Sequence, residues 1–104
     1  MIGYEVVFRQ EALDHLEELF DFIADAGAPE NAASFTESIV TFCDGLAAFP
    51  LRGTARDDLR PGLRTIGFRK RVLIAFAVLK DSVVIIGVFY GGRDHERLLS
   101  TEPS

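Results

Sequence analysis

Basic and aromatic residues flanking a long apolar stretch are the side chains best suited to chemistry. Arg69 and Arg71 precede the stretch, and Tyr90, Arg93 and His95 follow it. Attack of a ribose 2′-hydroxyl on the adjacent phosphate needs a general base, a cation to offset the charge on phosphorus, and an acid for the leaving oxygen. Arginines would supply the cation, and Tyr90 or His95 the acid. The base would have to be neutral His95 or an unplaced carboxylate, and no motif in the sequence holds either of them.

The same region also suits recognition of a protein. Arginine and aromatic side chains combine apolar contact with directed hydrogen-bond donors, and both are enriched at interfaces. If residue 71 begins one strand and residue 90 ends its antiparallel partner, the two groups meet at one edge of a sheet. The residues predicted to bind a target are Arg69, Arg71, Phe89, Tyr90, Arg93 and Arg97.

Residues typical of metal or cofactor sites are sparse. His15 and His95 stand apart, and the single cysteine, Cys43, falls within an apolar helical stripe where a small buried side chain is expected. Gly91-Gly92 has no phosphate-binding fingerprint around it and is interpreted as a turn. The sequence therefore predicts no metal and no cofactor.

Charge is unevenly distributed along the 104 residues, whose formal net charge is −5. Residues 1–51 carry ten acidic side chains and one basic one, whereas residues 52–71 carry seven basic and two acidic ones. A polarised surface of this kind indicates a charged partner, although acidic solvated helix faces would give the same count. The overall negative charge disfavours docking on the ribosome, where phosphate contacts dominate binding.

The apolar stretch itself predicts a β-hairpin with strands 72–79 and 83–90 around a turn at Lys80-Asp81-Ser82. Strict alternation places Val72, Ile74, Phe76 and Val78 on one face of the first strand. In the second strand it separates Val83, Ile85 and Phe89 from Val84, Ile86, Val88 and Tyr90. Because both faces are apolar, both must be covered. The chain is short, so we expect the second cover to come from a partner.

Two amphipathic helices are predicted before the hairpin, over residues 11–26 and 29–49. Gly27 suits the end of the first, Pro29 the first turn of the second, and Pro50 its end. Strands are expected at 4–9 and 63–68, and a turn or two of helix at 93–99. The order β-α-α-β-β-β predicts a single α+β domain, residues 1–104, with a helical hairpin on one face of an antiparallel sheet. With one cysteine, no leader sequence and no membrane-length apolar run, a cytoplasmic protein is expected.

Several short motifs occur together in a distinctive order. They are Phe-Pro-x-x-Gly at 49–53, Arg-Pro-Gly-Leu-Arg at 60–64 and Gly-x-Arg-Asp at 91–94, after a strand and the segment EALDHLEELFDFIA at 11–24. In this respect the chain resembles the ParE branch of the ParE/RelE toxin superfamily, the toxins of type II toxin–antitoxin modules that include plasmid stabilisation systems. The resemblance covers nearly the whole chain. It departs from the family where many members have histidine before the Gly-x-Arg-Asp motif, because this chain has Tyr90.

The resemblance implies a toxin that inhibits DNA gyrase, or the related topoisomerase IV, and blocks replication. It also implies neutralisation by a ParD-like antitoxin in a hetero-oligomer, with DNA contacted only through the antitoxin or gyrase and no membrane association. The antitoxin is expected on the apolar face of strands 72–79 and 83–90 and on the outer surface of helices 11–26 and 29–49. Two alternatives remain open: a ribosome-dependent mRNA endoribonuclease like the RelE-like and YoeB-like relatives, and an inactive toxin fold that only binds. For the ribonuclease, the candidate catalytic residues are Arg69, Arg71, Tyr90, Arg93 and His95.

Overall fold

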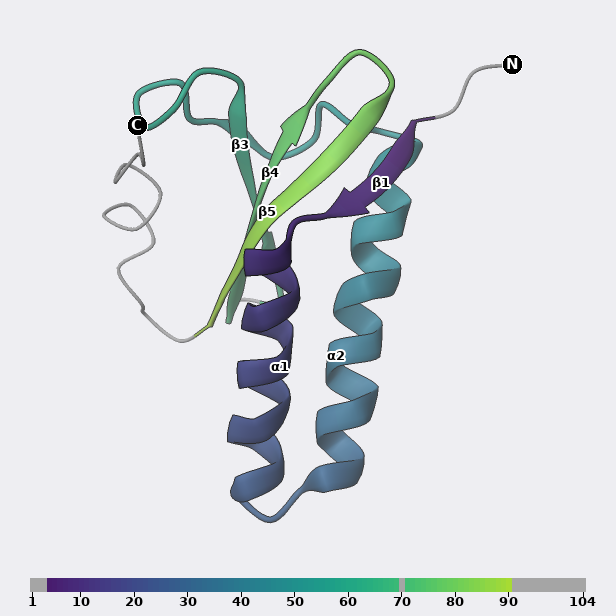
Figure 1. The fold of residues 1–104 in the computed structure, drawn as a ribbon, viewed down its shortest axis with the longest axis vertical. Helices are drawn as coiled ribbons and strands as arrows, with labels where there is room; N and C mark the ends of the chain where they lie inside the picture. The colour runs from purple at the N-terminus through teal and green to yellow at the C-terminus, as the bar shows by residue number, and fades with distance from the viewer. Residues whose placement is uncertain (1–3, 70, 91–104) are drawn as a thin grey trace.

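A computed structural model describes residues 4–69 and 71–90 of the chain. Its elements are β1 (Glu5–Phe8), α1 (Gln10–Asp25), α2 (Pro29–Asp44), a 3₁₀ turn η1 (Gly45–Ala47), β2 (Thr54–Ala55), β3 (Leu63–Phe68), β4 (Val72–Val78) and β5 (Ser82–Tyr90). The two helices form an antiparallel hairpin that extends beyond one end of the sheet (Figure 1). The predicted α+β fold with a helical hairpin is confirmed. The two-residue strand β2 was not predicted.

The strands form one sheet in the order β1-β5-β4-β3-β2. β5, β4, β3 and β2 pair antiparallel, as expected, but β1 runs parallel to β5, from Glu5 opposite Ser82 to Phe8 opposite Ile85. The prediction of a wholly antiparallel sheet is therefore wrong for its first strand. The long helical connection after β1 allows the chain to return beside it in the same direction, and the apolar pattern of a four-residue strand does not specify its neighbour.

Two of the three predicted signals, Gly27 and Pro29, mark helix boundaries in the structure. Gly27, with a φ of +91°, follows the end of α1, and Pro29 opens α2. The second helix ends at Asp44 and continues only as η1, so the predicted end at residue 49 is wrong. Gly45 is a poor helix former, and Pro50 disfavours a helical conformation at Phe49. Phe49, predicted as the last residue of this helix, is 67% exposed.

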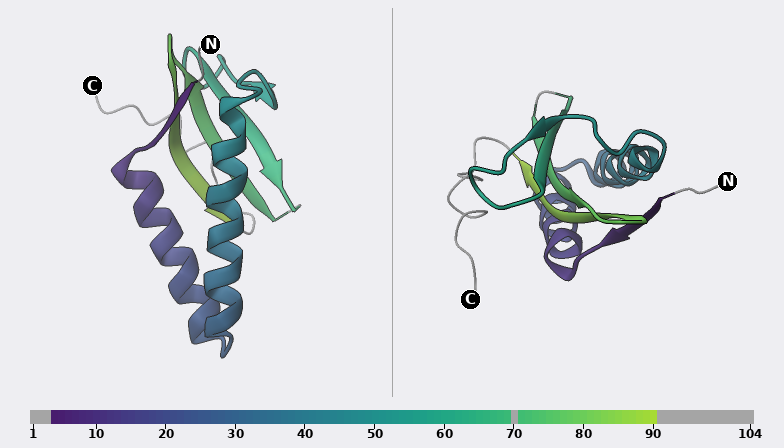
Figure 2. Two further views of the ribbon diagram at one scale, coloured as in Figure 1. Left: turned by 90° about the vertical axis from the view of Figure 1, so that its right-hand side faces the viewer. Right: turned by 90° about the horizontal axis from the view of Figure 1, so that it is seen from above.

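The main core lies between the helical hairpin and one face of the sheet, which Figure 2 shows from two further directions. Alternate residues of β4 and residues of β5 pack there against the buried sides of α1, α2 and η1. Its buried members are Ala12, Leu16, Leu19, Ile39, Cys43, Leu46, Val72, Ile74, Phe76, Val83, Ile85 and Val88.

A β-bulge in β5 changes which side chains reach this core. Phe76 pairs with Ile85, but the preceding residue, Ala75, pairs with Gly87, so Ile86 has no partner on β4. Beyond the bulge the alternation is shifted by one residue. Val88 and Tyr90 therefore pack on the helix side with Val83 and Ile85, and Phe89 faces the other side. The assignment of Phe89 to the same face as Val83 and Ile85 is wrong for this reason.

The second face of the sheet has a small core of its own. Leu63, Ala75 and Phe89 are buried there, and Leu59, Leu73 and Ile86 pack around them. Leu59 comes from the irregular segment between β2 and β3, so the chain supplies part of the cover that was expected from a partner. That a partner completes it stays a prediction.

Candidate interaction site

The β3–β4 turn and the end of β5 lie side by side at one end of the strands, as the strand pattern predicted. Phe68 pairs with Val72, and Val72 pairs on its other side with Tyr90. This ladder brings Arg69 and Arg71 of the turn beside Tyr90. The target-binding role of the three residues is a separate prediction, considered below.

These side chains line an open hollow of about 570 Å³ between the sheet edge and the helical hairpin. The lining combines two guanidinium groups, aromatic and aliphatic side chains, and polar side chains of α2. Its members are Ile23, Asn31, Ser34, Phe35, Ser38, Arg69, Arg71 and Tyr90.

Arg69 is held in an uncommon backbone conformation. Its φ of +54° is the only positive value at a non-glycine residue in the described part of the chain. The guanidinium carbon lies 4.9 Å from the ring centre of Phe68 and 5.9 Å from that of Phe35. Such stacking of a guanidinium over aromatic faces is favourable and limits the orientations of the side chain. The turn thus directs Arg69 across the hollow's rim towards α2.

Aromatic rings from four elements form a continuous row beside the hollow. Ring centres are 5.8 Å apart between Phe22 and Tyr90, 6.4 Å between Tyr90 and Phe35, 6.2 Å between Phe35 and Phe68, and 4.9 Å between Phe68 and Phe42. These separations are typical of interacting aromatic pairs. Phe35 and Phe42 were not among the residues predicted from the sequence to form a site. Their spacing of seven residues on one helix face was the available signal.

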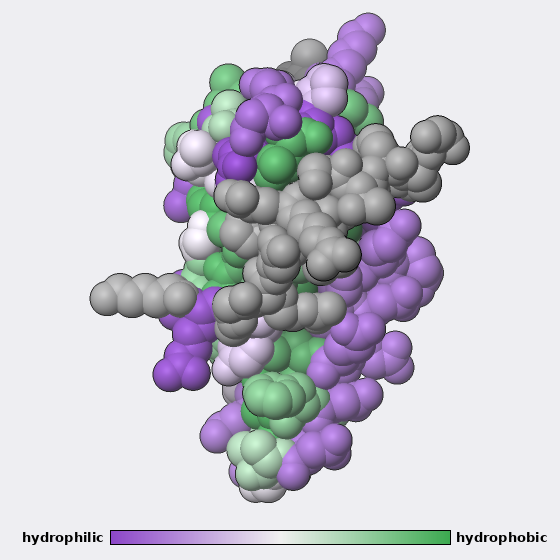
Figure 3. All heavy atoms as spheres, turned by 90° about the vertical axis from the view of Figure 1, so that its left-hand side faces the viewer, coloured by the Kyte–Doolittle hydropathy of each residue, from purple (hydrophilic) through white to green (hydrophobic). Residues whose placement is uncertain are grey.

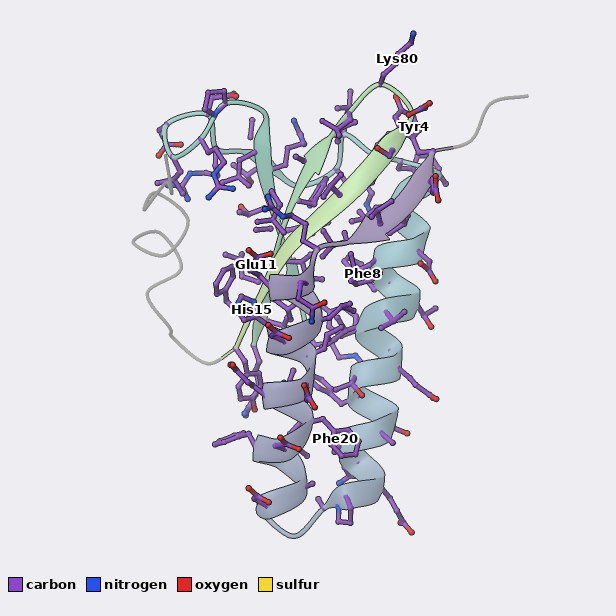
Figure 4. All side chains as sticks on the ribbon, viewed as in Figure 1. Tyr4, Phe8, Glu11, His15, Phe20 and Lys80 are labelled. Carbon is purple, nitrogen blue, oxygen red and sulfur yellow. The ribbon has the colours of Figure 1, made fainter. Side chains whose placement is uncertain are left out.

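Phe89 does not take part in this hollow. Its side chain is 5% exposed, and its ring centre lies 5.1 Å from that of His15 on α1. His15 Nδ1 in turn accepts a hydrogen bond from the backbone N–H of Val88, at 3.0 Å, which satisfies a donor on β5 beyond the end of its pairing with β1. Figure 4 shows His15 on the side of α1 nearest β5. His15 and Phe89 therefore hold the end of β5 in place. The predicted site residues Arg93, His95 and Arg97 lie outside the described residues.

Arginines of the basic stretch before the turn hold the loop from residue 51 to residue 62. The Arg64 guanidinium donates to the carbonyl oxygens of Leu51 and Arg52, at 2.7 and 3.0 Å. Arg56 pairs with Asp58 at 2.8 Å, and this hydrogen bond holds the pKa of the Asp58 carboxyl below its usual value. Gly53 lies where an added Cβ would be 2.3 Å from the Thr65 carbonyl oxygen. The glycine of the Phe-Pro-x-x-Gly motif and the last arginine of Arg-Pro-Gly-Leu-Arg are thus structural.

An apolar groove lies between α1 and α2. It is lined by Leu16, Glu17, Phe20, Thr36, Glu37 and Val40. Figure 4 shows Phe20 on the side of α1 that faces α2. The two helices carry nine acidic side chains and no lysine or arginine. The groove therefore has apolar walls within a pair of acidic helices. On the side of the molecule that Figure 3 shows, hydrophilic residues of the lower half likewise lie beside a strip of hydrophobic residues.

Comparison with known proteins assigns the chain to a family. The model of the family described as "ParE toxin of type II toxin-antitoxin system, parDE" matches residues 6–95. This chain belongs to the ParE toxin family. Toxin ParE1 of Mycobacterium tuberculosis, in two strains, is 27% identical over 85 residues, covering 82% of this chain and 87% of the relative.

The fold agrees with this membership. A solved structure titled "Chromosomal ParDE TA system from P. aeruginosa" superposes with a TM-score of 0.74 at 20% identity, covering 85% of this chain and 96% of that one. At this identity the match supports the ParE fold rather than any particular partner.

The described lining of the hollow in this ParE family member offers cationic, aromatic and neutral polar groups. Among the described residues, the lining of the hollow contains no carboxylate and no imidazole, so no general base stands beside Arg69, Arg71 and Tyr90. Burial, with Asp44 adding a smaller effect, raises the pKa of the Cys43 thiol to about 12, which keeps it protonated and unreactive. Within residues 4–69 and 71–90, no group of three or more metal-binding side chains occurs. No helix in that part of the chain is long and apolar enough to span a membrane.

Proposed function

We propose that the protein is a type II toxin that inhibits DNA gyrase and blocks replication, and that a ParD-like antitoxin neutralises it by direct binding. The observation that carries the proposal is the match of the ParE toxin family over residues 6–95. A hollow rich in arginine and aromatic side chains, without a general base among its described lining residues, supports a toxin that acts through an interface.

The gyrase part is tested with purified gyrase and the free toxin. Supercoiling activity should fall as toxin is added, and linear cleaved DNA should accumulate. The same assay with topoisomerase IV identifies the alternative target. Unchanged activity of both enzymes at toxin concentrations far above theirs would refute this part of the proposal.

Variants distinguish the interface from a ribonuclease centre. Truncation after Gly92, or the pair Arg93→Ala and Arg97→Ala, should abolish toxicity while leaving antitoxin binding in place. Tyr90→Phe should leave toxicity largely intact, because only a hydroxyl is lost. Loss of toxicity in Tyr90→Phe, together with cleaved transcripts in cells expressing the unaltered toxin, would favour an mRNA endoribonuclease.

The groove between α1 and α2 is our candidate for part of the antitoxin site. Its apolar walls would bury the apolar side of an amphipathic segment, and the acidic helices would attract basic residues along that segment's edges. Phe20, 37% exposed within the groove, is the natural residue to alter. Phe20→Asp should weaken antitoxin binding at least about tenfold, because it places a charge in an apolar contact.

Leu51→Asp is the matched control, since Leu51 is exposed and lies in the loop between η1 and β2, outside the groove and outside the strands and helices where the antitoxin is expected. Equal antitoxin affinity in the two variants, measured by titration calorimetry, would remove the groove from the interface.

A further inference from the structure

Two guanidinium groups share the hollow at the β3–β4 turn without an acidic partner among the described residues. In the described part of the chain the ion pairs are Arg9 with Glu11 and Arg56 with Asp58. Neither Arg69 nor Arg71 is paired there, although both line the same hollow. Two like charges at one site repel each other, and an anion placed between them removes that repulsion.

Arg69 is already oriented before any ligand arrives. Its left-handed backbone conformation and its contacts with Phe68 and Phe35 limit where the guanidinium can lie. A preoriented guanidinium loses little side-chain entropy when it binds, and its planar donors match a carboxylate or phosphate with two parallel hydrogen bonds. The left-handed conformation is unfavourable for arginine, so it is a feature that a binding role would explain.

The rest of the lining favours a ligand with an apolar part. Ile23, Phe35 and Tyr90 provide an aliphatic and aromatic wall, and Asn31 and Ser34 add neutral hydrogen-bond donors on α2. A peptide segment with an acidic side chain next to an aromatic or aliphatic one would place its carboxylate at the arginines and its apolar side chain against this wall.

Nucleic acid fits the surroundings less well. The helical hairpin that forms one wall carries nine acidic side chains and no lysine or arginine, and the whole chain has a net charge of −5. Nucleic-acid binding depends on neutralising many phosphates, and an extended polyanion would run along this acidic wall. A single carboxylate can reach the two arginines without electrostatic repulsion from the acidic helices.

From these observations we infer that the hollow is a carboxylate-binding site, which accepts an acidic side chain together with a neighbouring apolar side chain from a protein partner. This inference rests on the proposed function in one respect: the partner that supplies the segment is the poisoned target. The recognition chemistry follows from Arg69, Arg71, Phe35 and Tyr90 alone.

The probe is a capped dipeptide, acetyl-phenylalanyl-glutamate amide, titrated into ¹⁵N-labelled toxin and followed by NMR. The guanidinium Nε–H signals of Arg69 and Arg71 should move in a saturable way. The matching glutamine dipeptide should bind at least about fivefold more weakly, because charge-assisted hydrogen bonds are about twice as strong as neutral ones. A short oligothymidine at equal concentration should move these signals less than the glutamate dipeptide does.

Variants separate the site from general charge effects. Arg71→Gln should weaken binding of the glutamate dipeptide about tenfold, and Lys80→Gln, with the same change in net charge, should leave it unchanged. Lys80 lies at the tip of the β4–β5 hairpin (Figure 4), at the opposite end of β4 from Arg71.

Equal binding of the glutamate and glutamine dipeptides, stronger binding of oligothymidine, or equal loss in Arg71→Gln and Lys80→Gln would each overturn the inference. If the toxin inhibits gyrase but no dipeptide binds, the inference alone fails. If the dipeptide binds but gyrase and topoisomerase IV are unaffected, the proposed function fails and the site remains.

Discussion

The left-handed conformation of Arg69 predicts that glycine at this position is more stable than alanine. In most strands and helices alanine is more stable than glycine, but at a φ of +54° the order should reverse. The left-handed conformation costs a residue with a Cβ about 1–2 kcal/mol, and the greater freedom of glycine in the unfolded chain returns about 0.4–1 kcal/mol of that. Arg69→Gly should therefore be more stable than Arg69→Ala by about 0.5–1 kcal/mol.

For a domain of this size the difference corresponds to roughly 2–6 °C in Tm, which thermal denaturation followed by circular dichroism resolves easily. The unaltered protein should lie near or slightly above Arg69→Gly, because glycine also removes the contacts with Phe68 and Phe35, each worth about 0.5–1 kcal/mol at an exposed site. At Lys80, a turn residue that does not have a positive φ, glycine should give no such advantage over alanine. Equal or greater stability of Arg69→Ala would mean that the turn does not hold residue 69 in this conformation.

Three further changes test other parts of the structure. Gly53→Ala should destabilise the fold by at least about 2 kcal/mol in urea denaturation, because its Cβ would collide with the Thr65 carbonyl at a φ of +79°, whereas Gly45→Ala, with open space around it, should not. Replacing His15 with leucine leaves the Val88 N–H without its acceptor, so its amide hydrogen exchange should accelerate and stability fall by about 1–3 kcal/mol; unchanged exchange would remove His15 as the acceptor. The pKa of the Cys43 thiol is about 12 in the folded protein and 9.0 ordinarily, so the unfolded chain loses this proton first and the free energy of unfolding should fall as pH rises above 9. Cys43→Ala should lack this part of the decline. An identical decline in both proteins would contradict the raised pKa of Cys43.

The parts of the fold that the sequence predicts well are those with a regular apolar period. The helix of residues 10–25 repeats its apolar positions at helical spacing and is followed by Gly27, so both its existence and its end are specified locally. The second helix was predicted too long, because Phe49 continues the apolar period even though Gly45 and Pro50 prevent the chain from continuing it as a helix.

The site was predicted only in part, for a similar reason. Pairing of β3, β4 and β5 follows from the hairpin pattern and correctly brings Arg69, Arg71 and Tyr90 together. The contribution of Phe35, Asn31 and Ser34 depends on how α2 packs on the sheet, and no local pattern contains that information. The β-bulge at Ile86 could not be predicted from the sequence either, because Ile86 is as apolar as its neighbours. Only the pairing of β4 with β5 shows that it has no partner.

That unpaired residue has a consequence for length variation among related chains. Deleting Ile86 would join Ile85 and Gly87 into a regular ladder opposite Phe76 and Ala75, and every later residue of β5 would keep its present face. Deleting one residue elsewhere in the paired part of β5 would instead move the side chains on one side of the deletion to the opposite face of the sheet. A family member one residue shorter in this strand can thus present its tyrosine to the hollow as this one does, provided that the missing residue is the one at the bulge.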